Sequence, residues 1–218
     1  MPQEIEYGLS PKRVKSLYKI QSEVVSMNKK YQIIYADPPW KFEGNYGKVG
    51  KSRFSGFGAS LRYNLMEDRD ILAMPINDIT DNNSALFLWV VNSKLPLGIE
   101  VIKRWGFEFK TIAFCWVKTS RGTGMPNCRL GYWTLGGIEL CLLGIKGKMK
   151  PIKHNIRQVR MLPRLGHSIK PAQFRDDIVN LFGDLPRIEL FARQKVEVWE
   201  CWGNEVESDR DLGSVLKV

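Results

Sequence analysis

Continuous apolar runs alternate along the chain with segments of helical spacing. The runs are rich in β-branched and aromatic residues, which is typical of strands buried on both faces of a sheet. They cover residues 31–37, 84–91, 110–118, 138–145 and 187–193. Helical spacing of apolar positions marks residues 67–74, 95–105 and 171–182. The pattern predicts an α/β fold: a doubly wound, mostly parallel sheet with helices on both faces.

The two ends of the chain differ from this central pattern. Ser10 and Pro11 resemble a helix N-cap followed by proline at the first helical position. We therefore expect an amphipathic helix over residues 11–26, with Val14, Leu17, Tyr18, Gln21, Val24 and Val25 at helical spacing. The predicted organisation is an N-terminal helical appendage (1–28), one main domain (29–207) and a C-terminal tail (208–218). The last pair of apolar segments, within 187–203, is expected to close as a hairpin on the sheet edge.

Two stretches resist assignment to a regular element. Residues 41–62 are rich in Gly, Ser and basic residues, and residues 146–170 are strongly basic. No Asp or Glu occurs from Leu140 to Phe174. Long irregular segments in a compact domain are usually functional or mobile. The alternative is an ordinary solvated basic surface.

The charge balance points to a polyanionic partner. The 218 residues include 33 Lys+Arg against 23 Asp+Glu, a formal charge of +10. The four cysteines form no CxxC pair and only two histidines are present, so we expect a reduced intracellular protein without a metal site. The N-terminus lacks a signal pattern and the longest apolar run is too short to span a bilayer. These features predict a cytoplasmic protein that does not bind membranes.

The turn "DPPW" follows the first predicted strand directly. Its prolines fix the backbone, and they leave Asp37 and two carbonyls without a neighbouring donor. The Asp37 carboxylate and the Pro38 carbonyl can each accept a hydrogen bond from a planar amino group such as that of adenine. Trp40 offers a flat face for stacking, and the stiff turn would hold these groups in place before reaction. The alternative is a turn whose aspartate only caps the following chain.

The chain resembles the DPPW adenine-N6 methyltransferases, the MT-A-70-like family, in its small bacterial and phage form. The resemblance runs from about Tyr31 to Val206 and rests on ordered blocks: "IIYADPPW", "RYNLM", "ALFLWVVN", "WGFEFKTIAFCWVKT", "GYWTLGGIELCLLGIKG", "HSIKPAQF", "RIELFARQ" and "WGNE". It implies a class I S-adenosylmethionine-dependent methyltransferase fold with permuted motif order, the catalytic turn coming first and the cofactor segment last. No GxGxxG follows any strand, so nothing supports an ordinary dinucleotide-binding site.

The resemblance also implies roles for individual residues. Asp37, Pro38, Pro39 and Trp40 match the catalytic motif, and Asp37 also lies near the methionine part of the cofactor. The implied cofactor contacts are Lys170 with the carboxylate, Arg193 on the ribose side, and Asn204 and Glu205 with adenine and ribose. The implied substrate contacts are Tyr63 in a loop over the target base, and Trp133 and Glu139 near the substrate pocket. The basic segments would grip the nucleic-acid backbone, through Lys148, Lys153, Arg157 and Arg160 among others.

The chain departs from the family pattern in three places. Lys195 and Val196 stand where the eukaryotic mRNA enzyme has a His-Asn pair, Glu200 stands where small relatives often have Asp, and Glu205 stands where the mRNA enzyme has glutamine. These departures bear on the implied contacts with the ribose side of the cofactor.

The leading hypothesis is methyl transfer from S-adenosylmethionine to adenine N6 in nucleic acid, with DNA favoured over RNA because the chain carries no targeting extension. A duplex substrate would require the adenine to leave the stack. Methylation of a protein glutamine amide fits the turn but not the charge. A non-catalytic nucleic-acid-binding subunit on the same fold is the alternative from another class. A homodimer is expected from relatives, and the host would be a bacterial or phage-infected cell.

Overall fold

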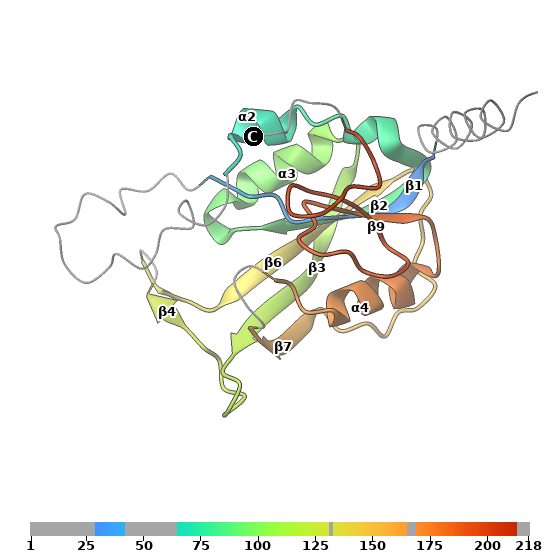
Figure 1. The fold of residues 1–218 in the computed structure, drawn as a ribbon. Coiled ribbons are helices and arrows are strands. Elements are labelled where there is room, and N and C mark those ends of the chain that lie inside the picture. The colour runs from blue at the N-terminus through green and yellow to red at the C-terminus, as the bar shows by residue number, and fades with distance from the viewer. Residues whose placement is uncertain (1–28, 42–64, 131–132, 165–168, 213–218) are drawn as a thin grey trace, which may run out of the picture.

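In the computed structural model, residues 29–41, 65–130, 133–164 and 169–212 are described (Figure 1). A seven-stranded sheet with the order β7-β3-β6-β2-β1-β8-β9 forms its centre. The strands are β1 (Tyr31–Ala36), β2 (Thr80–Val90), β3 (Glu108–Thr119), β6 (Ile138–Lys146), β7 (Val159–Pro163), β8 (Arg187–Leu190) and β9 (Glu200–Trp202). A separate two-stranded sheet joins β4 (Arg129–Leu130) to β5 (Leu135–Gly136). All strands predicted from the apolar runs are confirmed.

The helices predicted over 67–74, 95–105 and 171–182 are confirmed as well: α2 (Asp68–Leu72), α3 (Leu95–Arg104) and α4 (Gln173–Phe182). Short 3-10 helices, η2 (Ile76–Ile79) and η3 (Asn92–Lys94), flank β2. Among the described helices, none is both long and apolar enough to cross a membrane.

The two faces of the sheet are both covered, as the continuous apolar runs predict. Successive residues of β2 point to opposite faces: Leu86 and Leu88 join a core under α2 and α3, whereas Phe87 and Trp89 join a core under α4. Figure 1 shows α2 and α3 on one side of the sheet and α4 on the other. A doubly wound architecture follows, and the sequence prediction of it is confirmed.

One strand makes the sheet mixed rather than wholly parallel. β1 runs parallel to β2 and β8, and β3 runs parallel to β7. β6 runs antiparallel to both β2 and β3. In its described residues the segment between β3 and β6 forms no crossover helix, and the chain returns at the same edge, which requires antiparallel pairing. β6 therefore begins at the edge where the parallel strands end; this carboxyl edge is called the pocket edge below, and the opposite one the amino edge.

The prediction of an edge hairpin within 187–203 is wrong. β8 and β9 pair in parallel, with Ile188 opposite Glu200 and Leu190 opposite Trp202. The chain returns through the loop 191–199, whose backbone takes a positive φ at Phe191 (62°) and Val198 (59°). Few residues other than glycine favour this conformation, so nothing in the sequence indicated that the chain returns here to pair β9 in parallel with β8.

The basic stretch 146–170 is also not wholly irregular. It contains β7, an edge strand paired with the C-terminal part of β3. Its sequence "VRMLP" is short and carries Arg and Pro, which edge strands tolerate and central strands do not. The apolar pattern was therefore too weak to reveal it.

The predicted helix over 11–26 and most of the segment 41–62 lie outside the described residues. The described part of the predicted C-terminal tail packs on the domain: the Asp209 carboxylate accepts the Cys201 N–H at 3.0 Å, and Leu212 joins the core. The division into appendage, domain and tail stays a prediction.

Candidate active site

The DPPW turn leaves β1 at the centre of the pocket edge. β1 lies between β2, reached through α2, and β8, reached through α4 on the other face. This is the topological switch point, where open α/β sheets bind ligands. The Asp37 N–H donates to the Leu190 carbonyl at 3.4 Å, which holds the turn against the end of β8.

The sequence suggested that the carbonyls of the turn have no neighbouring donor, but in the structure both of them accept a hydrogen bond. The Trp40 N–H donates to the Pro38 carbonyl at 2.9 Å, and the Met66 N–H donates to the Pro39 carbonyl at 3.0 Å. The turn is tighter than expected because the chain folds back on itself within three residues. Each carbonyl oxygen has a second lone pair, so the Pro38 oxygen keeps the capacity to accept one more hydrogen bond.

Trp40 is a wall of the site rather than an open platform. Its side chain is only 3% exposed, and its Nε1–H donates to the Trp89 carbonyl at 2.9 Å. The indole is thereby fixed in the core beside the turn. Stacking of a base on Trp40 stays a prediction, and it concerns only the part of the ring that lines the hollow.

Four charged side chains meet at the pocket edge. Lys170 Nζ lies 2.6 Å from Asp37 Oδ2 and 3.2 Å from Glu139 Oε2. Glu139 is also paired with Lys118. Each residue comes from a different element: Asp37 follows β1, Lys118 lies near the end of β3, Glu139 near the start of β6, and Lys170 precedes α4. The reversed direction of β6 brings Glu139 to this edge.

The pKa values of the charged groups in this cluster are shifted to different extents. Burial raises the pKa of Asp37, and Lys170 opposes this only in part. Burial also acts against the charge of Glu139, but Lys170 and Lys118 outweigh it and lower the pKa of Glu139 to about 2. Burial disfavours the charge on Lys170 too, yet the carboxylates of Asp37 and Glu139 raise its pKa. Asp37 is thus the carboxylate of this cluster whose protonation lies nearest to neutral pH.

The ring of Trp89 packs against the ammonium group of Lys170. Lys170 Nζ lies 5.1 Å from the centre of the Trp89 ring, within range of a cation–π interaction. The Trp89 Nε1–H in turn donates to the Tyr35 hydroxyl at 2.8 Å in the core. The position of the lysine is therefore set by two carboxylates and an aromatic face.

Two adjoining hollows share these groups. The first is lined by the DPPW turn together with Trp89, Glu139 and Lys170. The second lies at the ends of β1 and β8, and its lining includes Ile169, Arg175, Glu189, Phe191, Gln194 and Glu205. Asp37, Lys170 and Arg193 line both. Asp37 thus stands where two bound molecules would meet.

The second hollow combines an aromatic ring with charged groups. The backbone of Phe191 is strained, and its ring meets Trp202 edge-on with ring centres 5.4 Å apart. Arg193 Nη1 lies 3.7 Å from Glu205 Oε1, with the Glu205 side chain 53% exposed. Asn204 is exposed and directly precedes Glu205, but it does not line the hollow. Non-glycine residues with strained backbone gather at functional sites.

The structure does not bring every predicted substrate residue to the pocket. Tyr63 lies outside the described residues. Trp133 is 91% exposed on the β4–β5 turn and lines neither hollow. Glu139 does line the first hollow, as predicted for the substrate side, while it also holds Lys170.

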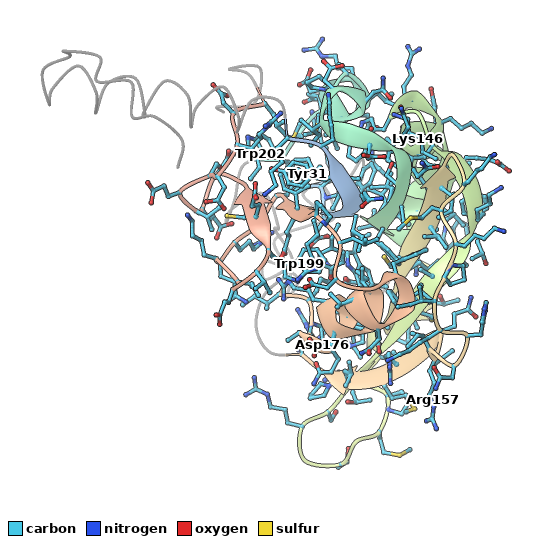
Figure 2. All side chains as sticks on the ribbon, turned by 90° about the vertical axis from the view of Figure 1, so that its right-hand side faces the viewer. Tyr31, Lys146, Arg157, Asp176, Trp199 and Trp202 are labelled. Atoms are coloured by element: carbon cyan, nitrogen blue, oxygen red, sulfur yellow. The ribbon has the colours of Figure 1, made fainter. Side chains whose placement is uncertain are left out.

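The basic run 146–164 is not one surface. Because β6 is antiparallel, it carries the chain to the amino edge, where the Lys148 N–H donates to Asn83 Oδ1 at 2.7 Å and Lys153 Nζ to Asn180 Oδ1 at 2.9 Å. Figure 2 looks onto this edge, where Tyr31 begins β1 and Lys146 ends β6. Lys148 and Lys153 therefore lie away from the DPPW turn. The basic residues predicted to bind the nucleic-acid backbone do not form one surface beside the site.

The two arginines of the run differ from each other. Arg157 is exposed, just before β7. Arg160 donates through Nε and Nη2 to the two carboxylate oxygens of Asp177 in α4, its Nε lying 2.8 Å from Asp177 Oδ2. A contact of Arg160 with phosphate would require this ion pair to break.

Sequence reasoning missed several residues of the site. Lys118, Trp89, Phe191 and Arg175 fall within predicted strands and helices, yet all of them touch the cluster or line a hollow. For Lys118 a signal was present, since a lysine at the end of an apolar strand must lie at an edge of the sheet. The other three needed the packing of α4 and β8 around β1.

Comparison with known proteins matches the sequence to a family. The sequence model of MT-A70 matches residues 31–205. The Type II methyltransferase M.MunI of a Mycoplasma species is 34% identical over 194 residues, which cover 84% of this chain and 80% of M.MunI. The human N(6)-adenosine-methyltransferase catalytic subunit METTL3 is 29% identical over 187 residues, which cover 84% of this chain but 29% of METTL3.

A relative with a different role also matches. The N6-adenosine-methyltransferase non-catalytic subunit MTB of Arabidopsis thaliana is 32% identical over 137 residues, which cover 62% of this chain and 16% of MTB. The chain therefore spans most of M.MunI but less than a third of either eukaryotic protein.

Proposed function

The chain belongs to the MT-A70 family, and from this premise we propose that it transfers a methyl group from S-adenosylmethionine to the N6 amino group of adenine in DNA. The observation that carries the proposal is the position of Asp37, at the junction of two hollows and bonded to Lys170 at 2.6 Å. One hollow would take the cofactor and the other the adenine.

The second hollow fits S-adenosylmethionine by its donors and acceptors. Lys170 provides a point charge for the cofactor carboxylate, and Asp37 an acceptor for its ammonium group. Glu205 offers a carboxylate to ribose hydroxyls, and Phe191 a ring against which a purine can lie. When bound, the cofactor supplies an electrophilic methyl group on a sulfonium centre.

The first hollow fits a planar amino group. Asp37 and the free lone pair of the Pro38 carbonyl would accept the two N–H bonds of adenine, with Trp40 and Pro39 as walls. The prolines fix both acceptors before the base arrives, so their dipoles need no reorganisation during the reaction. Glu139 would keep Lys170 in place when Asp37 turns its oxygen to the substrate.

The residues assist an in-line displacement without a covalent intermediate on the protein. The N6 nitrogen would form a bond to the methyl carbon as the bond from that carbon to sulfur breaks, and one N6 proton would then leave to Asp37 or to water. Asp37 and Pro38 orient the nitrogen lone pair, and such positioning supplies much of the rate. Burial around Asp37 strengthens these hydrogen bonds.

DNA is favoured as the substrate because the match covers most of a Type II methyltransferase but only a fraction of the eukaryotic N(6)-adenosine enzymes. An adenine in a duplex would have to leave the stack to reach Asp37. We place this activity in the cytoplasm of a bacterial or phage-infected cell, with a homodimer as the expected assembly.

RNA is the second candidate substrate, supported by the 29% identity to METTL3. A non-catalytic role is the third, supported by the match to MTB. The intact DPPW turn and its buried ion pair favour an active subunit over a scaffold.

The test is methyl transfer from labelled S-adenosylmethionine to duplex DNA, single-stranded DNA and RNA, with N6-methyladenine identified by mass spectrometry. We expect product in DNA and none with Asp37→Ala. Cofactor binding by calorimetry, measured on the same samples, separates the alternatives. Binding without product on any nucleic acid would contradict the proposed substrate, and absence of binding would leave the scaffold role.

A further inference from the structure

Between β3 and β6 the chain forms a projection, called the β3–β6 arm below (residues 120–137). It begins with a tight turn, in which the Ser120 N–H donates to the Met125 carbonyl at 3.0 Å, and continues into the β4–β5 hairpin. The Lys118 N–H donates to the Gly137 carbonyl at 2.8 Å and closes its base. In Figure 1, β4 lies beyond the end of β3 and the start of β6, away from the three covering helices.

The arm is joined directly to the first hollow. Glu139, which lines the hollow, follows the base of the arm by two residues. From Glu139 to Trp133 the chain can span at most about 20 Å, which is about the width of a DNA duplex. A duplex that presents an adenine to Asp37 would therefore lie within reach of the arm.

The arm exposes large apolar side chains. Met125 is 66% exposed, Trp133 91% and Leu135 62%, and Ile138 at the base is 41% exposed. These are four of the eight large hydrophobic side chains exposed among the described residues, within a stretch of 14. A concentration of exposed apolar surface marks an interaction site.

The charge of the arm selects the kind of partner. From Thr119 to Ile138 the sequence contains Arg121 and Arg129 and no acidic residue. Apolar side chains framed by arginines alone suit a polyanion that also offers apolar faces. DNA provides both, in its phosphates and in its stacked bases.

We propose that the β3–β6 arm enters duplex DNA beside the target adenine, and that Trp133 stacks in the gap which the adenine leaves when it turns into the first hollow. The proposal rests on the proposed function and extends it from the reaction to the opening of the duplex. Turning a base out of the duplex loses the free energy of its stacking and base pairing, and an inserted apolar side chain compensates for part of that loss. On a single strand no gap exists, so the arm has no such task there.

The first experiment compares native and heat-denatured plasmid DNA as methyl acceptors. Trp133→Ala should lower the rate on native DNA about tenfold or more, the effect of removing one base–aromatic stack, and change the rate on denatured DNA less than twofold. Trp133→Phe should recover most of the loss. The matched control is Val198→Ala, which shortens a side chain that is 73% exposed where the loop 191–199 reaches the amino edge, and should alter neither rate.

The second experiment does not depend on methyl transfer. Fluorescence anisotropy compares binding of an intact duplex with that of the same duplex carrying one abasic site. The wild-type protein should prefer the abasic duplex at least fivefold, and Trp133→Ala should lose that preference. If no DNA is methylated, the proposed function fails and this measurement alone decides on the arm.

Three outcomes would overturn the proposal. Equal losses on native and denatured DNA would mean a structural role for Trp133. A change in mass by light scattering in Trp133→Ala would assign the arm to contact between copies of the chain. Unchanged rates and unchanged preference for the abasic duplex would show that the arm does not enter the DNA.

Discussion

Lys170 at the pocket edge differs in its partners from Lys146 and Lys153 at the amino edge. At the pocket edge Lys170 has a side chain only 7% exposed and lies between the carboxylates of Asp37 and Glu139. At the amino edge Lys146 Nζ donates to Asn77 Oδ1 at 2.8 Å and to Thr80 Oγ1 at 3.0 Å, and Lys153 donates to the amide oxygen of Asn180. Lys170 is thus paired with carboxylates, and Lys146 and Lys153 with neutral groups, whereas Lys29 and Lys110, also at the amino edge, pair with Glu200 and Glu108.

This difference separates two uses of positive charge. A buried lysine between carboxylates is fixed in place and can orient a small molecule or a reacting group. An exposed lysine held by a neutral amide keeps its full charge and contributes only to the field around the protein. The formal charge of +10 therefore says little about the site, because the lysines that matter to chemistry are the neutralised ones.

The largest expected effect comes from the pocket edge. Asp37→Asn keeps the shape of the side chain but removes the charge that holds Lys170 and accepts from the substrate amine. We expect methyl transfer to fall about a thousandfold, the size of losing a preorganised electrostatic contact. Rates measured by labelled methyl transfer test this, with circular dichroism as the control for folding. A loss below tenfold would mean that Asp37 is not the central acceptor.

An arginine of the outer strand β7 should act on stability instead. Arg160→Gln leaves Asp177, which is 6% exposed, without its partner. Because the Arg160 side chain is itself 29% exposed, we expect the free energy of unfolding to fall by about 2 kcal/mol, less than for a fully buried pair.

Thermal denaturation of Arg160→Gln should show the melting temperature lowered by roughly 6 °C. The double variant Arg160→Gln with Asp177→Asn should recover much of the loss, since it leaves no unpaired charge. Equal stability of the single variant and the wild type would show that the ion pair contributes nothing.

The coupling at the pocket edge also predicts a pH dependence. Since burial raises the pKa of Asp37, the reaction should decline with falling pH above the range usual for an aspartate. Glu139→Gln removes an anion that raises this pKa, so the acid limb should move to lower pH. Lys170→Met removes a cation that lowers it, so the limb should move to higher pH.

The measurement is the pH profile of kcat/KM at saturating cofactor for the three proteins. If the acid limb moved in the same direction in Glu139→Gln and in Lys170→Met, the coupling between these groups would be contradicted.

The smallest effect is expected at the amino edge. Lys148→Gln combined with Lys153→Gln should change duplex affinity less than about twofold and leave its salt dependence nearly unaltered, because these side chains face away from the DPPW turn. Arg129→Gln on the arm should lower the salt slope by about one, because one phosphate is no longer neutralised. Titrations at several salt concentrations compare the two. A steep loss of affinity at the amino edge would mean that DNA binds there as well.

The sequence predicted the layers of the fold better than its turns. Apolar runs identify β1, β2, β3, β6 and β8 because burial on both faces leaves a continuous signal. β7 and the parallel pairing of β9 were missed, since edge strands tolerate polar residues and the reversal through Phe191 depends on an unusual backbone conformation.

The site was predictable where a motif is local and hidden where it depends on packing. The DPPW turn could be read from four adjacent residues, and Lys170 from the resemblance. The cation–π contact of Lys170 with Trp89 and the pairing of Glu139 with Lys118 arise only when β2, β3 and β6 lie together. The antiparallel direction of β6, which no local pattern specifies, also decides where each basic residue of 146–164 lies.

β6 is hydrogen-bonded along both of its sides, with Leu140 opposite Val90 of β2 and Ile138 opposite Val117 of β3. The position of Glu139 is therefore set by the sheet and not by the length of the chain that leads into it. Since closing a longer loop adds little free energy, the segment between Ser120 and Gly137 can be lengthened, shortened or exchanged while the reaction centre keeps its geometry. The protein is in this respect modular: the arm between these two residues can differ without moving Glu139 from the reaction centre.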